Sequence, residues 1–352
     1  TVIAGLTRTR MAVSRHSVED LEQLPVMTDI TAQATVRLLN QSVASAYWSN
    51  PKVMALMIQK AVQLSVRYGN DPASALFWGS YGMVLAGIVG KPEQGIAYAD
   101  LAVRLADRFG ARAQPGGVRF TRDALVAPAT TPLREIEPSL ERAYTIGLEY
   151  GEIGFAMAAY FFVSLHRLVS GAPLDTLESQ LASAVWLIRQ HAAIRNLDQP
   201  LALRQNAHDM QLGPASGGSF TGPHLDGDSH TDSTDKMTIA WTHTFRAMSR
   251  FHFGDAVGAY DDIVAAGPYL DAMLGQALVP VHHLYGVLAA SAVATTGDAG
   301  ARRAARKHRK SLAWWAKHNP VDFATPLVLA DGALAAADGK TEEAKRLLEE
   351  GT

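Results

Sequence analysis

Apolar residues recur at helical spacing along almost the whole chain. In residues 31–47, for example, Ala34, Leu38, Val43 and Tyr47 follow one helical pattern. Alternating Val, Ile and Thr runs bounded by hairpin turns, which would indicate strands, are nearly absent. The pattern predicts an all-α protein with helices over residues 31–47, 51–69, 72–90, 93–109, 132–150, 152–170, 174–195, 197–211, 236–253, 255–273, 277–296, 298–317, 320–338 and 341–350.

Helix starts and one interruption are visible in the sequence. Asn50-Pro51 and Asp71-Pro72 each place a capping residue before a proline, which suits the first turn of a helix. Residues 111–127 contain Gln114-Pro115-Gly116-Gly117, and the pattern assigns them neither to a helix nor to a loop.

Four glycines, each between two helical stretches, lie 81, 83 and 85 residues apart: Gly90, Gly171, Gly254 and Gly339. Two helix pairs per interval give about 41 residues per pair, longer than the ~34 of a strict tetratricopeptide repeat. The spacing predicts an α-solenoid of antiparallel helix hairpins that is tetratricopeptide-like. A chance alignment among the 29 glycines is the alternative.

One segment differs from the rest of the chain. Residues 213–235 are rich in Gly, Ser, Thr, Asp and His and contain few apolar residues, a composition typical of a flexible connection. We therefore predict a linker there, with one helical-repeat array over residues 1–212 and a second over residues 236–352. The second array is expected to be truncated, because the chain stops after the first helix of a hairpin.

Composition narrows the class of protein. The chain has 352 residues, of which 48% are hydrophobic, so it can bury an ample core. A net charge of −2 gives no overall field that would attract nucleic acid, and the absence of cysteine excludes disulfides and thiolate metal sites. The first fifteen residues lack the apolar core of a secretory signal, and the apolar run 153–165 is too short to span a bilayer. We expect a cytoplasmic fragment of a longer protein, with no nucleic-acid partner and no membrane insertion.

Two histidine-containing segments are candidate metal sites. From His224 to Asp232, imidazoles and carboxylates alternate, but an EF-hand frame beginning at Asp226 lacks the required glycine and glutamate. A solvated linker is the preferred interpretation of that run. His282 and His283 are adjacent, so on a helix their side chains point about 100° apart and cannot easily hold one ion. We expect one in the core and one exposed.

Catalytic signatures are absent from the sequence, which contains no nucleotide phosphate loop, dinucleotide-binding turn, zinc-protease pair or nucleophile elbow. The carboxylate pairs Glu135/Glu137 and Glu342/Glu343 lie near helix starts, where acids stabilise the helix dipole. The rings at 77–78, 160–162 and 314–315 are predicted to pack in the core, and the basic run 302–310 to form a solvated helix face. No catalytic, cofactor-binding or metal-binding residue is predicted, so we expect a non-enzymatic segment without a cofactor.

Several stretches resemble the long helical region of large multidomain signalling ATPases. Residues 24–29 look like its beginning, and YWSNPKVMALMIQKAVQLSVRYGNDPASALFWGSYG (47–82) is similar to its most recognisable part. The similar stretches that follow are FGDAVGAYDDIVAAGPYLDAMLG (253–275), VPVHHLYGVLAA (279–290) and WWAKHNPVDFATPLVLADGAL (314–334). In that family, kinase-like and ATPase modules precede the helical region, and GAF and histidine-kinase modules follow it. The matching motifs are turns and core positions, so no functional residue carries over.

The resemblance implies a helical scaffold or relay that binds a protein partner or neighbouring modules of the same chain. Two alternatives stay open: an independent effector domain of an ATP-dependent transcription regulator, binding a small molecule or peptide, and a metal-dependent enzyme using residues 224–232. The packing hypothesis also predicts that alanine in place of any single polar side chain spares folding. Gly79→Leu or Trp314→Asp is expected to disrupt a helix interface.

Overall fold

The computed structural model describes residues 2–193, 197–213 and 220–351. In these ranges the protein is all-α and has sixteen helices of seven or more residues; the β contacts are two isolated bridges. The helices are α1 (Val2–Val13), α3 (Ile30–Ser49), α4 (Pro51–Tyr68), α5 (Ser74–Gly87), α6 (Pro92–Phe109), α7 (Pro115–Leu125), α8 (Leu133–Glu149), α9 (Ile153–Val169), α10 (Leu174–Gln190), α11 (Asp198–Leu212), α13 (Lys236–His252), α14 (Ala256–Ala266), α15 (Leu278–Ala294), α16 (Ala299–His318), α17 (Pro320–Ala337) and α18 (Thr341–Glu350), with the short helices α2 (Val18–Glu22) and α12 (Gly227–Thr231).

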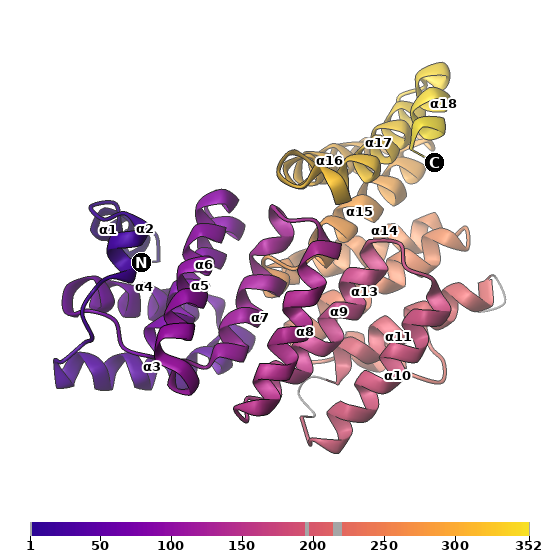
Figure 1. Cartoon of the computed structure of the whole chain (residues 1–352). Helices are drawn as coiled ribbons and strands as arrows, with labels where there is room; N and C mark the ends of the chain where they lie inside the picture. Colours follow the sequence, from indigo (N-terminus) through magenta and orange to yellow (C-terminus); the bar gives the residue numbers. More distant parts are fainter. Residues whose placement is uncertain (1, 194–196, 214–219, 352) are drawn as a thin grey trace. The chain divides into compact units, whose positions relative to one another are not determined.

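Consecutive helices pack as antiparallel pairs, for example α5 with α6, α13 with α14 and α15 with α16 (Figure 1). The four regularly spaced glycines, Gly90, Gly171, Gly254 and Gly339, lie in turns between consecutive helices, and all four have φ between 74° and 89°. Residues with a Cβ rarely adopt this conformation, so glycine closes each turn without strain. The prediction of a glycine turn between paired helices is confirmed. A continuous solenoid is a further step and belongs with the proposals below.

The two helix starts predicted before a proline differ in how well they match the structure. Asn50 caps α4 as expected, accepting a hydrogen bond from the backbone N–H of Val53 at 3.2 Å. At Asp71-Pro72 the helix begins two residues later than predicted, because α5 starts at Ser74. Asp71 instead accepts the N–H of Ala73 at 3.0 Å and pairs with Arg37 at 2.9 Å, so its side chain organises the turn before the helix.

The unassigned stretch 111–127 contains α7, flanked by short 3-10 turns. Its glycines serve the start of this helix: the Glu152 carboxylate accepts the N–H groups of Gly116 and Gly117, at 3.3 and 2.7 Å. A Cβ at Gly116 would also lie 2.8 Å from the Cα of Gly147 on α8. Two glycines therefore allow close helix packing here and do not interrupt the helical pattern. The helix expected over 255–273 is shorter than predicted. It ends at Ala266, and the remaining residues, which begin with Gly267-Pro268, form a 3-10 helix.

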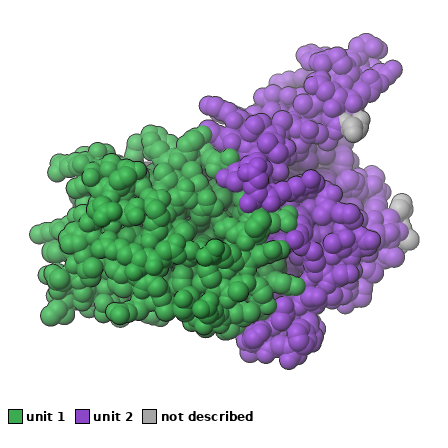
Figure 2. Space-filling view, in the orientation of Figure 1, with its two compact units in different colours: residues 1–130, 136–162, 274–276 green, residues 131–135, 163–273, 277–352 purple. Residues whose placement is uncertain are grey.

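Contacts divide the chain into two compact units, shown in separate colours in Figure 2. Unit 1 contains residues 1–130, 136–162 and 274–276, and unit 2 contains 131–135, 163–273 and 277–352. The core of unit 1 centres on α5, whose residues from Ser74 to Ala86 are all buried. Trp78 stacks on Tyr98 of α6 with ring centroids 5.9 Å apart and donates its indole N–H to Asn70 at 3.0 Å. Unit 2 has cores between α13, α14 and α15 and between α15, α16 and α17.

Candidate functional site

The polar segment expected to be a linker is described from Phe220 onward; residues 214–219 lie outside the described ranges. Phe220 and Leu225 are buried, at 0% and 3% exposure, and α12 covers residues 227–231. The segment packs against α13 within unit 2. Division of the chain into arrays 1–212 and 236–352 stays a prediction.

The alternating His and Asp residues of this segment contact separate partners. His224 Nε2 lies 3.7 Å from Glu178 on α10, and His230 Nε2 lies 3.7 Å from Asp198 on α11. Asp228 pairs with Arg246 of α13 at 3.1 Å. As far as the chain is described, these side chains do not form a group of three ligands around one point. The geometry gives no support to a metal-dependent enzyme built on residues 224–232.

A cluster of three histidines does form elsewhere in unit 2, between α15 and α16. One ring nitrogen from each of His282, His283 and His308 lies within 4.8 Å of the other two. The Nδ1 atoms of His283 and His308 are 3.0 Å apart, and the three ring centroids are separated by 5.2 to 5.4 Å. Among the described residues this is the group whose side chains could hold a metal ion.

The surroundings fix the three rings in place. His282 Nδ1 is 3.2 Å from the Thr244 hydroxyl of α13, whereas its buried Nε2 has no hydrogen-bond partner. A Cβ at Gly286 would lie 2.6 Å from Nδ1 of His308, so glycine leaves the space that this ring fills. Burial lowers the pKa of His283 to about 3 and that of His308 to about 4, helped by the nearby Lys307 charge. Burial lowers the pKa of His282 well below its ordinary value too, so all three rings are neutral at pH 7.

The prediction for the adjacent pair is confirmed for the core histidine and wrong for the exposed one. His282 is fully buried, but His283 is half-buried, because α16 packs over it and contributes His308. His308 belongs to the basic run that was predicted to be a solvated face. The arginines of that run fit the prediction: Arg302, Arg306 and Arg309 are partly exposed and pair with carboxylates of α17 and the turn after it. Only the histidine turns towards α15.

Unit 2 also contains a buried charge cluster between α13 and α14. The carboxylate of Asp262, 2% exposed, accepts hydrogen bonds from Arg246 at 2.6 to 3.0 Å and from Arg250 at 2.8 Å. His243 Nδ1 lies 2.7 Å from the same group. Burial opposes ionisation of Asp262, but these hydrogen bonds and the arginine charges outweigh it and hold its pKa below the ordinary value. The cluster pairs a buried carboxylate of α14 with two arginines of α13, which is the arrangement of a structural ion pair.

The aromatic residues considered for a ligand site mostly lie in the core, as predicted. Phe77, Trp78, Phe161, Phe162 and Trp315 are between 0% and 6% exposed. Trp314 is half-buried and lies against His318, with ring centroids 4.9 Å apart. Most of these rings therefore fill helix interfaces, whereas Tyr160 and Trp314 are half-buried.

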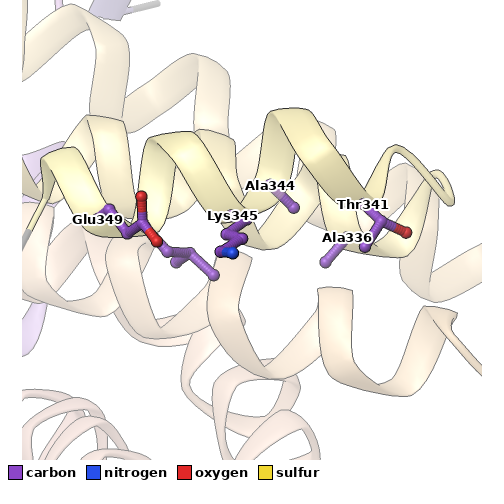
Figure 3. Close-up of a pocket in the computed structure, with 6 residues that line it drawn as sticks. Ala336, Thr341, Ala344, Lys345 and Glu349 are labelled. Carbon is purple, nitrogen blue, oxygen red and sulfur yellow. The ribbon is translucent and has the colours of Figure 1, made fainter.

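A surface cavity of about 560 Å³ lies along α18, at the end of unit 2 (Figure 3). Ala336 of α17 lies on one side of it, and α18 contributes Lys345 and Glu349 together with Thr341, Ala344 and Leu348. The cavity combines small apolar side chains with one charge of each sign. Such a lining can accept a peptide or a helix, but it contains no histidine and no pair of carboxylates.

Helix α17 is long and apolar enough to cross a membrane, judged by length and composition, with a mean hydropathy of 1.2 over 18 residues. Within unit 2 it packs against α15, α16 and α18, and buries Phe323, Ala330 and Leu334. Its Asp331 pairs with Arg309 of α16 at 2.6 Å. Packing in the core accounts for part of its apolar character, and the absence of membrane insertion stays a prediction.

Comparison with known proteins finds a distant and partial similarity. Over 144 residues, 40% of this chain, the sequence is 26% identical to the hybrid signal transduction histidine kinase G of Dictyostelium discoideum. The matched region takes in 4% of that protein's length, so the chain resembles a small region of a histidine kinase signalling protein. No protein-family profile matches the chain, and no solved structure matches it significantly. The similarity supports the histidine-kinase part of the resemblance drawn from the sequence.

Proposed function

We propose that this chain is a non-catalytic helical-repeat segment of a larger ATP-dependent signalling kinase. It binds a protein partner or neighbouring modules of the same chain and transmits conformational changes between them in the cytoplasm. The observation that carries the proposal is the similarity to a region of a hybrid histidine kinase, found in a chain whose helices pack as hairpins. The four glycine turns at near-equal intervals support a repeat architecture of tetratricopeptide type.

Transmission through such a segment has a physical basis in the way the hairpins pack. Each hairpin contacts mainly its neighbours, so a small rotation at one interface changes the position of the next hairpin. The interfaces are rigid where backbones approach closely, as between Gly82 of α5 and Gly95 of α6. A chain of these interfaces can couple distant modules without a single hinge.

The first test of the proposal is the gene sequence on either side of this segment. Flanking ATPase and histidine-kinase modules in the same reading frame would support it. A start codon just before Thr1 with a stop codon after Thr352 would contradict it. That result would favour the alternative, an independent effector domain for a small molecule or peptide, for which the cavity along α18 is the observed candidate site.

A non-catalytic segment makes a further prediction about its own chemistry. The isolated chain is expected neither to hydrolyse ATP nor to incorporate the γ-phosphate of labelled ATP, because its sequence contains no phosphate loop and no phosphoacceptor motif. Phosphate release and radiolabel incorporation measure the two reactions, with a histidine kinase catalytic fragment as the positive control. Stoichiometric labelling of the purified chain would contradict its assignment as non-catalytic.

A further inference from the structure

The rings of His282, His283 and His308 have the mutual spacing of ligands around one metal ion. Zinc binds imidazole nitrogens at about 2.0–2.1 Å, so two nitrogens on one tetrahedral ion lie about 3.3 Å apart and their ring centroids about 5.2 Å apart. Here one nitrogen pair is separated by 3.0 Å, and the centroid separations are 5.4, 5.4 and 5.2 Å. One nitrogen of each ring also lies within 4.8 Å of the other two, so all three can face a single ion.

We propose that His282, His283 and His308 bind a single divalent transition-metal ion, with zinc as the ion, and that this ion clamps α15 to α16. The inference does not depend on the signalling role proposed above. The adjacent histidines can share the ion because their ring centroids lie 5.4 Å apart. The third ligand, His308, lies opposite them on the antiparallel helix α16. The α15–α16 turn is about midway between the pair and His308 in sequence, so the hairpin places them side by side.

The hydrogen bonding of the metal-free rings leaves a lone pair available on His282. The Nδ1 atoms of His283 and His308 share a hydrogen bond, so one of these two rings changes tautomer when both bind the ion. If Nδ1–H of His282 donates to the Thr244 hydroxyl, its Nε2 carries the lone pair, and this buried atom has no partner. An unpaired buried acceptor is unfavourable, and a metal ion would satisfy it. An imidazole nitrogen binds a metal ion through its lone pair, so binding requires the uncharged form of each ring.

Three protein ligands leave one position of a tetrahedral ion for water or another small ligand. The nearby Lys307 repels a cation, and among the residues that the structure describes no carboxylate joins the group of ligands. We therefore expect an affinity in the micromolar range, weaker than that of sites whose ligands carry negative charge. Because the ligands are histidines and not cysteines, oxidation of thiols cannot disrupt this site.

The test uses the full 352-residue chain, stripped of metal with a chelator and dialysed. Titration with ZnCl₂ by calorimetry, with elemental analysis after gel filtration, is expected to give one ion per chain and a raised Tm. Co²⁺ is expected to give the visible absorption of a tetrahedral complex. Absence of a stoichiometric ion, or an octahedral Co²⁺ spectrum, would overturn the proposal.

Variants separate the site from non-specific binding by surface histidines. His308→Gln and His283→Gln keep a neutral side chain of similar size, and each is expected to weaken zinc binding about 100-fold or more. His191→Ala removes an exposed histidine outside the cluster and is expected to leave the Kd unchanged. Circular dichroism checks that each variant is folded. Equal zinc affinity in His308→Gln and the parent would contradict the assignment even if both bind one ion.

Thr244 is a positioning residue in this proposal, because it acts through His282. Thr244→Val is expected to weaken zinc binding about 10-fold while the stoichiometry stays at one ion. Thr244→Ser keeps the hydroxyl and is expected to restore the parent Kd. A role in packing alone would give the opposite order, because valine fills the space of threonine better than serine does.

Discussion

Asp262→Ala is expected to lower the free energy of unfolding of unit 2 by about 3–5 kcal/mol, the usual effect of removing one partner from a buried ion pair. The substitution leaves the Arg246 guanidinium, 8% exposed, without the carboxylate that accepts three of its hydrogen bonds. Asp228 still pairs with Arg246, so the loss should fall at the lower end of that range. Denaturation followed by Trp241 fluorescence or by hydrogen exchange in α13 and α14 measures it.

The matched control is Asp331→Ala, which removes a two-bonded Asp–Arg pair of similar geometry at the surface. Arg309 donates to Asp331 at 2.6 and 2.9 Å, but both side chains are about a third or more exposed. Exposed pairs of this kind contribute about 0.2–1 kcal/mol. If the two alanine variants lost equal stability, burial would not be what makes Asp262 important.

The same carboxylate makes a prediction about pH. Because the pKa of Asp262 is lower in the folded protein than in the unfolded chain, its ionised form stabilises the fold at pH values above the ordinary carboxyl pKa of about 3.9. This contribution is lost as the pH falls through the folded-state pKa. The parent protein should therefore lose more stability between pH 5 and acid than Asp262→Ala does. If the free energy of unfolding fell by the same amount with pH in both proteins, the pKa of Asp262 would not be depressed.

This expectation revises one drawn from the sequence, that alanine in place of any single polar side chain would spare folding. The sequence shows Asp262 as one acid in a helix with Asp261 beside it, and helical spacing alone does not say which is buried. In the structure the partners come from α13, twelve to nineteen residues away, and they converge on Asp262. Burial and pairing of a charge are set by the packing of two helices, which local periodicity does not contain.

The elements themselves were predictable because their signals are local. The cap at Asn50, the glycine turns and the apolar spacing all act within a few residues, and they predicted most of the helices. The spacing missed α1 and α7 and placed the end of α14 too late. The histidine cluster was missed for the opposite reason: His308 is 25 residues from His283 and lies in a basic run. Its available signal was the placement of the three histidines about a hairpin turn. The binding partner and the signalling role of the chain do not follow from helix packing, and both stay proposals.

Gly82→Ala is expected to lower the stability of unit 1 by about 1–3 kcal/mol, although alanine is the better helix former. The added Cβ would press on the backbone carbonyl of Gly95 in α6 and lie 3.3 Å from the N of Ala99. The reverse contact is equally close, since a Cβ at Gly95 would lie 2.6 Å from the carbonyl oxygen of Gly82. Backbone atoms cannot rotate away, so α5 and α6 would have to separate along the whole pair and loosen the packing of Trp78 on Tyr98.

Gly79, one turn earlier on α5, provides the control for this effect. A Cβ there would meet the side chains of Ala102 and Thr121 at 3.5 and 3.6 Å, which is ordinary van der Waals contact. Gly79→Ala should therefore leave stability unchanged or raise it by up to about 1 kcal/mol through helix propensity. The larger Gly79→Leu should still destabilise, because the site is buried and further carbons overpack it. Hydrogen exchange in α5 and α6 compares the variants. Equal protection in Gly82→Ala and Gly79→Ala would contradict the prediction, because the interface would then have room for a Cβ at residue 82.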